Sequence, residues 1–165
     1  MNTSPAKIGS GALAMLFVFG LAIPAHAGTG DQHAHETGEG LELQLDNGAR
    51  WVTDESLRTG MTEIREAFER KLPRFRAGTL EQQDYAELAG TVDKQLNFMF
   101  NNCDLPPAAD AQLHKLLASI SGAAAALREE ERAPKGMRSL HRALEAYGTH
   151  FDHPGWSVES GSGSN

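Results

Sequence analysis

Four stretches of the chain carry an apolar residue at every third or fourth position, and this repeat constrains the fold more than any other feature. An α-helix turns once every ~3.6 residues, so this spacing gathers apolar side chains into one stripe along a helix. Each stripe must be buried against a neighbour. In chain order the stripes are Leu57, Met61, Ile64, Phe68, Leu72; Tyr85, Leu88, Val92, Leu96, Met99; Leu113, Leu116, Ile120, Ala124, Leu127; and Met137, Leu140, Leu144, Tyr147, Phe151.

Capping and turn residues separate the four stripes. Thr53 is a plausible N-cap for the first helix, which we expect to end between Pro73 and Gly78. Thr79 followed by Gln82 reads as a capping box for the second helix. Two prolines within residues 104–107 end the second helix and begin the third, and residues 129–136 form the next joint. Four helices joined by short loops predict an all-α, antiparallel up-down four-helix bundle.

The segment before the first helix predicts an extended lead-in to the bundle. Leu41, Leu43 and Leu45 alternate with polar residues, and residues 46–48 read Asp-Asn-Gly, which is a turn signal. We therefore assign residues 41–157 to the bundle with its flanking caps. Residues 28–40 are rich in glycine and polar residues, and we expect a disordered linker there and a similar tail at 158–165.

Residues 1–27 have the layout of a secretory signal. Lys7 supplies a positive charge, an apolar run follows as far as Pro24, and residues 25–27 read Ala-His-Ala, which suits signal peptidase. The uninterrupted apolar core is short for a membrane span. We expect cleavage after Ala27 and a periplasmic or secreted protein that is not inserted in the membrane.

Composition and motifs narrow the classes of function. The formal net charge is −7, so the chain has no electrostatic reason to bind nucleic acid. The single cysteine, Cys103, cannot form an intrachain disulfide. Glycine-rich phosphate loops, HExxH motifs and a Ser-His-Asp order are missing, so we do not expect an enzyme.

Antiparallel topology brings soft and imidazole side chains toward one end of the predicted bundle. At ~1.5 Å per residue, candidate ligands from all four helices fall within about 12 Å of that end. Cysteine, methionine and histidine together favour copper or zinc. The sequence thus predicts a metal site for copper binding or homeostasis, served by a periplasmic metal-delivery or redox partner. The candidate ligands are Met61, Met99, Cys103, His114 and His150.

Each candidate ligand also has a purely structural interpretation. Met61 and Met99 lie on apolar stripes, where methionine commonly fills the core. Cys103 is compatible with a small buried hydrophobic residue, and His114 lies beside its stripe, about 10 Å from Cys103 along the bundle axis. A metal-free structural or interaction module therefore stays open as an alternative. A homodimer also stays open, although no outer face carries a decisive apolar stripe.

The organisation of residues 53–152 resembles the exported four-helix cytochromes, both the soluble b-type bundle cytochromes and cytochromes c-prime. In the b-type family a methionine early in the first helix and a histidine near the end of the last helix bind haem iron. Met61 and His150 stand at corresponding places, so this resemblance implies a b-type haem and electron transfer. The c-prime pattern is not met, because Cys-x-x-Cys-His is missing and Cys103 lies in the wrong helix.

The sequence is also similar to a group of small exported proteins of undefined role. The shared features are an opening of the form DNGxxWxTDxxLRxGM, here at residues 46–61, and an HPGW ending, here at residues 153–156. This similarity implies that the opening and the ending form one unit with the bundle. It implies no established activity.

Overall fold

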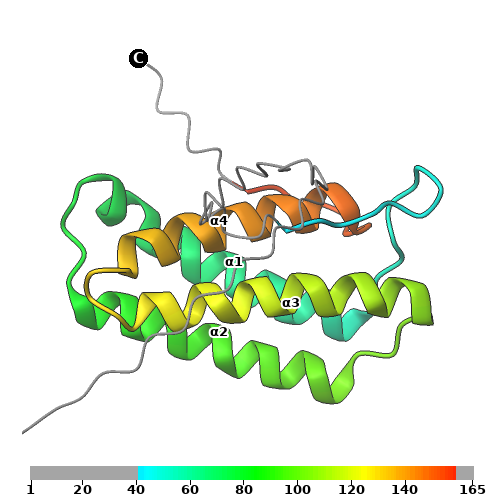
Figure 1. Cartoon of the computed structure of the whole chain (residues 1–165), viewed down its shortest axis with the longest axis horizontal. Helices are drawn as coiled ribbons and strands as arrows, with labels where there is room; N and C mark the ends of the chain where they lie inside the picture. The colour runs from blue at the N-terminus through cyan, green and yellow to red at the C-terminus, as the bar shows by residue number, and fades with distance from the viewer. Residues whose placement is uncertain (1–40, 159–165) are drawn as a thin grey trace, which may run out of the picture. The chain divides into compact units, whose positions relative to one another are not determined.

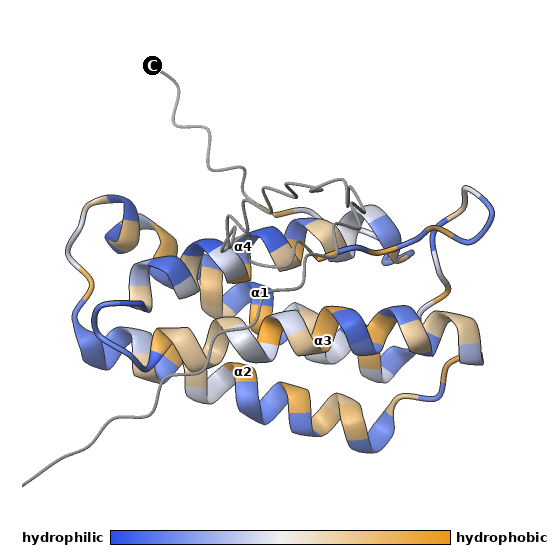
Figure 2. Ribbon diagram, viewed as in Figure 1, coloured by the Kyte–Doolittle hydropathy of each residue, from blue (hydrophilic) through white to orange (hydrophobic). Residues whose placement is uncertain are grey.

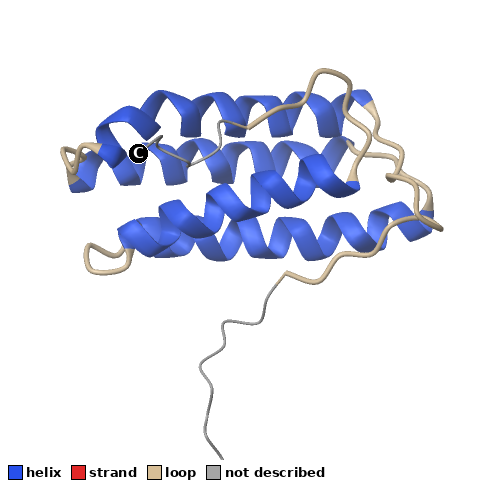
Figure 3. Ribbon diagram, turned by 90° about the horizontal axis from the view of Figure 1, so that it is seen from above, coloured by secondary structure: helices blue, strands red, loops and turns tan. Residues whose placement is uncertain are grey.

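The computed structural model describes residues 41–158, and four helices form this part of the chain (Figure 1). They are α1 (Glu55–Arg76), α2 (Gln82–Asn102), α3 (Pro107–Leu127) and α4 (Ala133–His150). Between residues 41 and 158 there is no strand, and Figure 3 shows helices joined by loops. The predicted all-α four-helix bundle is confirmed. The predicted signal (1–27), the linker (28–40) and the tail after residue 158 lie outside the described residues.

Consecutive helices pack side by side and run in alternating directions (Figure 1). The start of α1, the end of α2, the start of α3 and the end of α4 therefore share one end, which we call the lead-in end. The opposite end, which holds the α1–α2 and α3–α4 loops, is called the far end. The backbones of α1 and α4 approach each other in few places.

The apolar stripes form the core, as their spacing predicts. Every stripe residue of α1 and α3 is buried, and so is every residue of the stripe that runs along α4 to Phe151. In the α2 stripe, Tyr85 is partly exposed. Polar residues occupy the outer positions of each helix, so hydrophilic (blue) and hydrophobic (orange) segments alternate along the ribbons in Figure 2. In the described part of the chain no helix is long and apolar enough to cross a membrane.

Two predicted helix caps are wrong by one or two residues. Asp54 caps α1 and accepts a hydrogen bond from the Leu57 amide at 2.6 Å, because the Thr53 hydroxyl donates to the Asp152 carbonyl instead. At α2 the capping box pairs Glu81 with Asp84. Serine, threonine and acidic side chains can all cap, so the sequence alone does not choose among neighbours.

The end of α1 lies between Pro73 and Gly78, as predicted, because the helix continues through Pro73 and stops at Arg76. Proline lacks an amide donor, yet in the last turn the lost hydrogen bond is a single one. The turn closes when the Ala77 amide donates to the Pro73 carbonyl at 3.1 Å. Gly78 then adopts a φ of 66°, a left-handed conformation that glycine accepts without steric cost.

The lead-in is extended and makes the predicted turn. The Asp46 and Ala49 backbones pair, and Asn47 and Gly48 have φ values of 49° and 90°. Further on, Trp51 pairs in parallel with Phe151 just after α4. The lead-in is thereby fixed to the end of the last helix.

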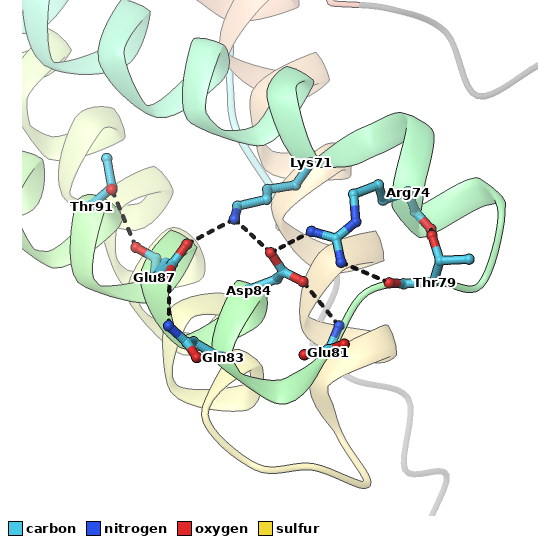
Figure 4. Close-up of polar contacts among 8 residues, drawn as sticks. All are labelled: Lys71, Arg74, Thr79, Glu81, Gln83, Asp84, Glu87 and Thr91. Atoms are coloured by element: carbon cyan, nitrogen blue, oxygen red, sulfur yellow. Dashed lines mark hydrogen bonds and ion pairs between the residues drawn. The ribbon is translucent and has the colours of Figure 1, made fainter.

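A charged network joins α1 and α2 near the far end (Figure 4). The Asp84 carboxylate accepts hydrogen bonds from Lys71 at 2.9 Å and from Arg74 at 2.8 Å. Lys71 also bonds to Glu87 at 2.9 Å. The Lys71 hydrogen bond, followed by the Glu81 backbone amide, lowers the pKa of Asp84 to about 2.

Candidate functional site

The two methionines among the predicted ligands are core residues. Met61 is completely buried and Met99 almost so. The Met99 side chain lies directly over Gly60, where a β-carbon would come within 2.5 Å of it. Contact of this kind fills space between α1 and α2, which is the usual role of a core methionine.

Cys103 lies at the lead-in end, as predicted, but its neighbour is a carboxylate. It is the C-cap residue of α2, is partly buried, and is hydrogen-bonded through its side chain to Asp54. Burial first, and then the Asp54 charge, raise the pKa of the thiol to about 12. A thiol in such surroundings stays protonated at neutral pH and is a poor nucleophile.

The two predicted histidine ligands lie apart from the core. His114 is on the outer surface of α3 with 59% of its side chain exposed, and its Nδ1 lies 3.0 Å from the Asp110 carbonyl oxygen. His150 is partly buried in the last turn of α4, and its Nδ1 lies 2.8 Å from the Ala146 carbonyl oxygen. Each ring is thus held by its own helix, one turn back.

Among the described residues, Cys103, His114 and His150 do not come together as one group of ligands. Over residues 41–158, no group of three or more His, Cys, Asp or Glu side chains is arranged to hold a metal ion. For haem, Met61 offers no open coordination position, because it is sealed inside the packed core. The macrocycle would have to displace buried side chains, so these residues do not fit it as they stand. Copper, zinc and haem binding stay predictions.

An aromatic cluster occupies the lead-in end instead. The buried Tyr147 ring stacks on Phe151 and meets Trp156 edge-on, with ring centroids 4.5 Å apart in the second pair. Its hydroxyl lies 3.0 Å from Nδ1 of His153. Burial raises the pKa of Tyr147, so the phenol stays protonated, and its hydroxyl can donate a hydrogen bond to the imidazole or accept one from it.

Residues 151–158, which we call the C-terminal strap, supply most of this cluster. The strap turns at residues 153–156, where Gly155 has a φ of 75° and the Trp156 amide donates to the His153 carbonyl at 3.1 Å. The Trp156 indole then lies against Gly148 of α4, where a β-carbon would come within 2.5 Å of the ring. Only a glycine leaves room for the indole at this point.

Arg65 of α1 fastens the strap from the other side. Its guanidinium lies 5.1 Å from the centroid of the Trp156 ring, and one of its nitrogens donates to the Ser157 carbonyl at 2.8 Å. The strap therefore bridges α4 and α1, two helices whose backbones approach each other in few places. The sequence signal for this arrangement is the HPGW turn at residues 153–156.

Two adjoining hollows flank the outer face of α1 on the same part of the bundle. The strap hollow has a volume of about 400 Å³ and is lined by α1 residues together with His153 and Pro154. The α2 hollow, of about 310 Å³, lies against Phe98 and its neighbours. Thr59 and Glu63 line both hollows, so the two form a continuous surface.

The α1 surface has mixed charge. Glu55 and Glu63 contribute carboxylates to the strap hollow, and Thr59 and Thr62 contribute hydroxyls. Arg58 also lines the hollow, but one guanidinium nitrogen is already bonded to the Thr53 carbonyl oxygen at 2.7 Å. The surface can therefore accept hydrogen bonds from a ligand, and Lys94 adds a cation where it lines the α2 hollow.

Comparison with known protein families, with curated proteins and with solved structures found no match. The two resemblances described above thus stay untested. Any functional conclusion has to come from the residues of this chain.

Proposed function

We propose that this chain is an exported recognition module that binds a partner protein through the outer face of α1, without using a bound metal. The location follows from the predicted signal at residues 1–27. The remainder of the proposal follows from the chemistry of the α1 surface.

The observation that carries the proposal is the continuity of the strap hollow and the α2 hollow. Both are shallow depressions on the outer face of α1, and they meet at Thr59 and Glu63. Small-molecule sites usually enclose most of their ligand, whereas a protein partner is bound over a broad open surface. These hollows have the form suited to a protein.

The side chains define what such a partner presents. Phe98 is 36% exposed and provides an aromatic anchor at one edge of the surface. Glu55 and Glu63 provide negative charge next to threonine hydroxyls. The complementary partner therefore offers a basic side chain to the carboxylates and an apolar side chain to Phe98. The net charge of −7 gives the chain no electrostatic reason to bind nucleic acid.

Site-specific photo-crosslinking tests the proposal. A photoreactive amino acid placed at Thr59 should capture one partner in the native compartment. The same residue at Ala118, exposed on α3, should not, because α3 packs on α2 and α4 rather than on α1. The purified partner should then bind the unlabelled chain, and Glu63→Arg should weaken binding about tenfold or more through charge repulsion.

Equal crosslinking from the two positions would overturn the proposal. So would undiminished binding by Glu63→Arg. Stoichiometric copper or zinc in the purified chain, with partner binding that disappears when the metal is removed, would instead favour the metal hypothesis.

A further inference from the structure

Three polar or charged residues are buried in the described part of the chain, and one of them has no partner there. Asp84 is held by its charged network, and Oε1 of Gln112 accepts a hydrogen bond from the Gln44 amide at 3.0 Å. Gln95 is only 7% exposed, yet its carboxamide makes no hydrogen bond with any residue between 41 and 158. Buried polar groups are nearly always hydrogen-bonded, so this glutamine requires an explanation.

Gln95 stands where helix packing alone would favour an apolar residue. It follows Val92 by three positions and precedes Met99 by four, and these two residues are buried on the same side of α2. That side faces α1, because the Met99 side chain lies over Gly60. An apolar side chain at this position would bury its surface without leaving an amide unpaired. Core packing therefore does not account for the glutamine.

Gln95 forms the floor of the α2 hollow. It is the one buried residue among the five that line the hollow, and the others are exposed at its rim: Thr59, Glu63, Lys94 and Phe98. In the described part of the chain, the unpartnered side-chain atoms that are sealed from solvent belong to Arg65 and Trp156. The Gln95 carboxamide is not sealed in this way, so a group bound in the hollow can reach it.

A carboxamide offers a hydrogen-bond donor and an acceptor side by side. A residue in an extended chain presents the same two groups, because its N–H and C=O point to one side, as in the hydrogen-bonded pairs of an antiparallel sheet. A helix uses its backbone groups internally and cannot offer both. A simple cation or anion would engage only the acceptor or only the donor. The group that best complements Gln95 is therefore an extended peptide backbone.

The groove between α1 and α2 has room for such a segment. Beyond the α2 hollow, toward the far end, the same two helices hold a third hollow of about 210 Å³, lined in part by Lys71 and Glu87, which Figure 4 shows joined by an ion pair. Thr59 of the α2 hollow and Lys71 of the third are 12 residues apart on α1, or about 18 Å. An extended chain covers this length with about five or six residues.

We infer that the groove between α1 and α2 binds an extended peptide segment of the partner, and that the Gln95 carboxamide pairs with the backbone of one residue in that segment. The inference rests on the proposed function, since it names what the partner places beside Thr59 and Glu63. Backbone pairing supplies affinity, and the exposed Phe98 ring selects an apolar side chain next to the paired residue.

The stability of the free chain provides the first test. Methionine is close to glutamine in length and lacks its hydrogen-bonding amide. Gln95→Met breaks no hydrogen bond within the chain and should melt at or above the wild-type temperature. Gln112→Met is the matched control and should melt lower, because it leaves the Gln44 amide without its acceptor. Gln95→Met melting as low as Gln112→Met would assign Gln95 a structural role and overturn the inference.

Binding provides the second test, with linear heptapeptides as the probe. Peptides displayed on phage are selected against the immobilised full chain, and selected sequences are then synthesised. They should bind Gln95→Met about tenfold more weakly than the wild type, because one pair of hydrogen bonds is lost. Gln112→Met, which changes a buried glutamine outside the groove, should bind them as tightly as the wild type. Equal affinity for Gln95→Met and the wild type would overturn the inference.

Replacing single backbone amides of a selected peptide by esters locates the pairing without changing the chain. Each ester removes one N–H donor. At one position the ester should weaken binding to the wild type about tenfold and have no effect on binding to Gln95→Met. The inference is wrong if no position behaves in this way, or if circular dichroism shows that the bound peptide is helical.

The outcomes separate this inference from the proposed function. A partner captured from Thr59 that binds Gln95→Met as tightly as the wild type would overturn the inference and leave the proposed function standing. Selected peptides that depend on Gln95, together with equal crosslinking from Thr59 and Ala118, would support peptide binding in the groove and overturn the proposed function alone.

Discussion

At the scale of single residues, Asp54 organises the lead-in end. Its carboxylate accepts hydrogen bonds from the Leu57 amide of α1 and the Asp104 amide after α2, both at 2.6 Å, and it also faces the Cys103 thiol. One side chain thus caps a helix, joins two helix ends and sets the chemistry of the only cysteine. Its effect on the thiol can be measured directly.

Cys103 should react slowly with iodoacetamide in the folded protein. A pKa of about 12 in place of 9.0 lowers the thiolate fraction roughly a thousandfold near pH 8, and the greater nucleophilicity of the thiolate offsets part of this. We expect alkylation at least ~10-fold slower in the native chain than in the unfolded chain. Mass spectrometry of timed samples provides the rate.

Asp54→Asn should accelerate alkylation, because asparagine still caps α1 but carries no charge. Asp104→Asn is the matched control, since Asp104 is exposed and its amide, not its side chain, contacts Asp54. Equal rates for Cys103 in the native and unfolded chains, or no effect of Asp54→Asn, would contradict the assignment.

The candidate ligands show why the sequence predicts such a site only in part. Axial position follows from counting residues along a helix, and on that basis Cys103 lies at the lead-in end as expected. The direction in which a side chain points around the helix axis is harder to predict. His114 directly follows the stripe residue Leu113, and one residue rotates the helix by about 100°, which places His114 on the surface. Asp54 comes to Cys103 from another helix, a contact that stripe spacing does not reveal.

At the scale of elements, α3 and α4 form the closest helix pair through small residues. Gly136 of α4 packs on the α3 backbone, where an added β-carbon would lie 2.8 Å from the Leu127 nitrogen and 2.9 Å from the Ala123 oxygen. The alanine-rich sequence of α3 is what permits this approach. The stripes predict the four helices correctly, whereas the N-caps of α1 and α2 lie one or two residues from their predicted positions, because neighbouring residues offer equivalent hydrogen bonds.

Gly136→Ala should destabilise the protein by about 1–3 kcal/mol, because rigid backbone atoms block the new methyl group and the helices have to separate. Alanine has the higher helix propensity, so helix propensity alone would make Gly136→Ala stabilising. A destabilised variant therefore reports the steric clash between α3 and α4. Urea unfolding followed by circular dichroism measures the change in the free energy of unfolding.

Gly122→Ala is the matched control. Gly122 is an exposed position inside α3, and nothing lies within 4 Å of its added β-carbon. Here only helix propensity acts, and stability should rise by up to about 1 kcal/mol. A stabilising Gly136→Ala would show that the two helices do not approach as described.

At the scale of the whole bundle, the two ends are held by different chemistry. The far end depends on the Asp84 network between α1 and α2, and the lead-in end on aromatic packing and the strap. The apolar stripes predict the bundle and its antiparallel order well, because burial of four faces leaves few arrangements. The stripes do not predict the contacts that hold the helices together at each end of the bundle, since most of those contacts come from residues outside the stripes.

Acid should weaken the far end through Asp84. Its pKa is lowered from 3.8 to about 2 in the folded state, so its stabilising effect is complete above pH 3.8 and is lost as the pH falls toward 2. Asp84→Asn should lower the melting temperature near neutral pH and flatten its decline in this acid range. Thermal unfolding at a series of pH values measures both effects.

Glu66→Gln serves as the comparison for Asp84→Asn. Glu66 and Arg70 form an exposed pair at 3.8 Å, and such pairs contribute little. Its melting curve should follow that of the wild type at each pH. A loss as large as that of Asp84→Asn would mean that general surface charge, and not the network, governs acid stability.

The pairing of Trp51 with Phe151 also sets the limits of the folding unit. The last carbonyls of a helix have no partner within the helix, and at the end of α4 the His150 carbonyl accepts its hydrogen bond from the Trp51 amide at 2.8 Å. In return, the Trp51 carbonyl accepts from the Asp152 amide at 2.8 Å. The final turn of the last helix is thus completed by a residue that precedes the first, and the smallest fragment that keeps it intact begins no later than Trp51 and ends no earlier than Asp152.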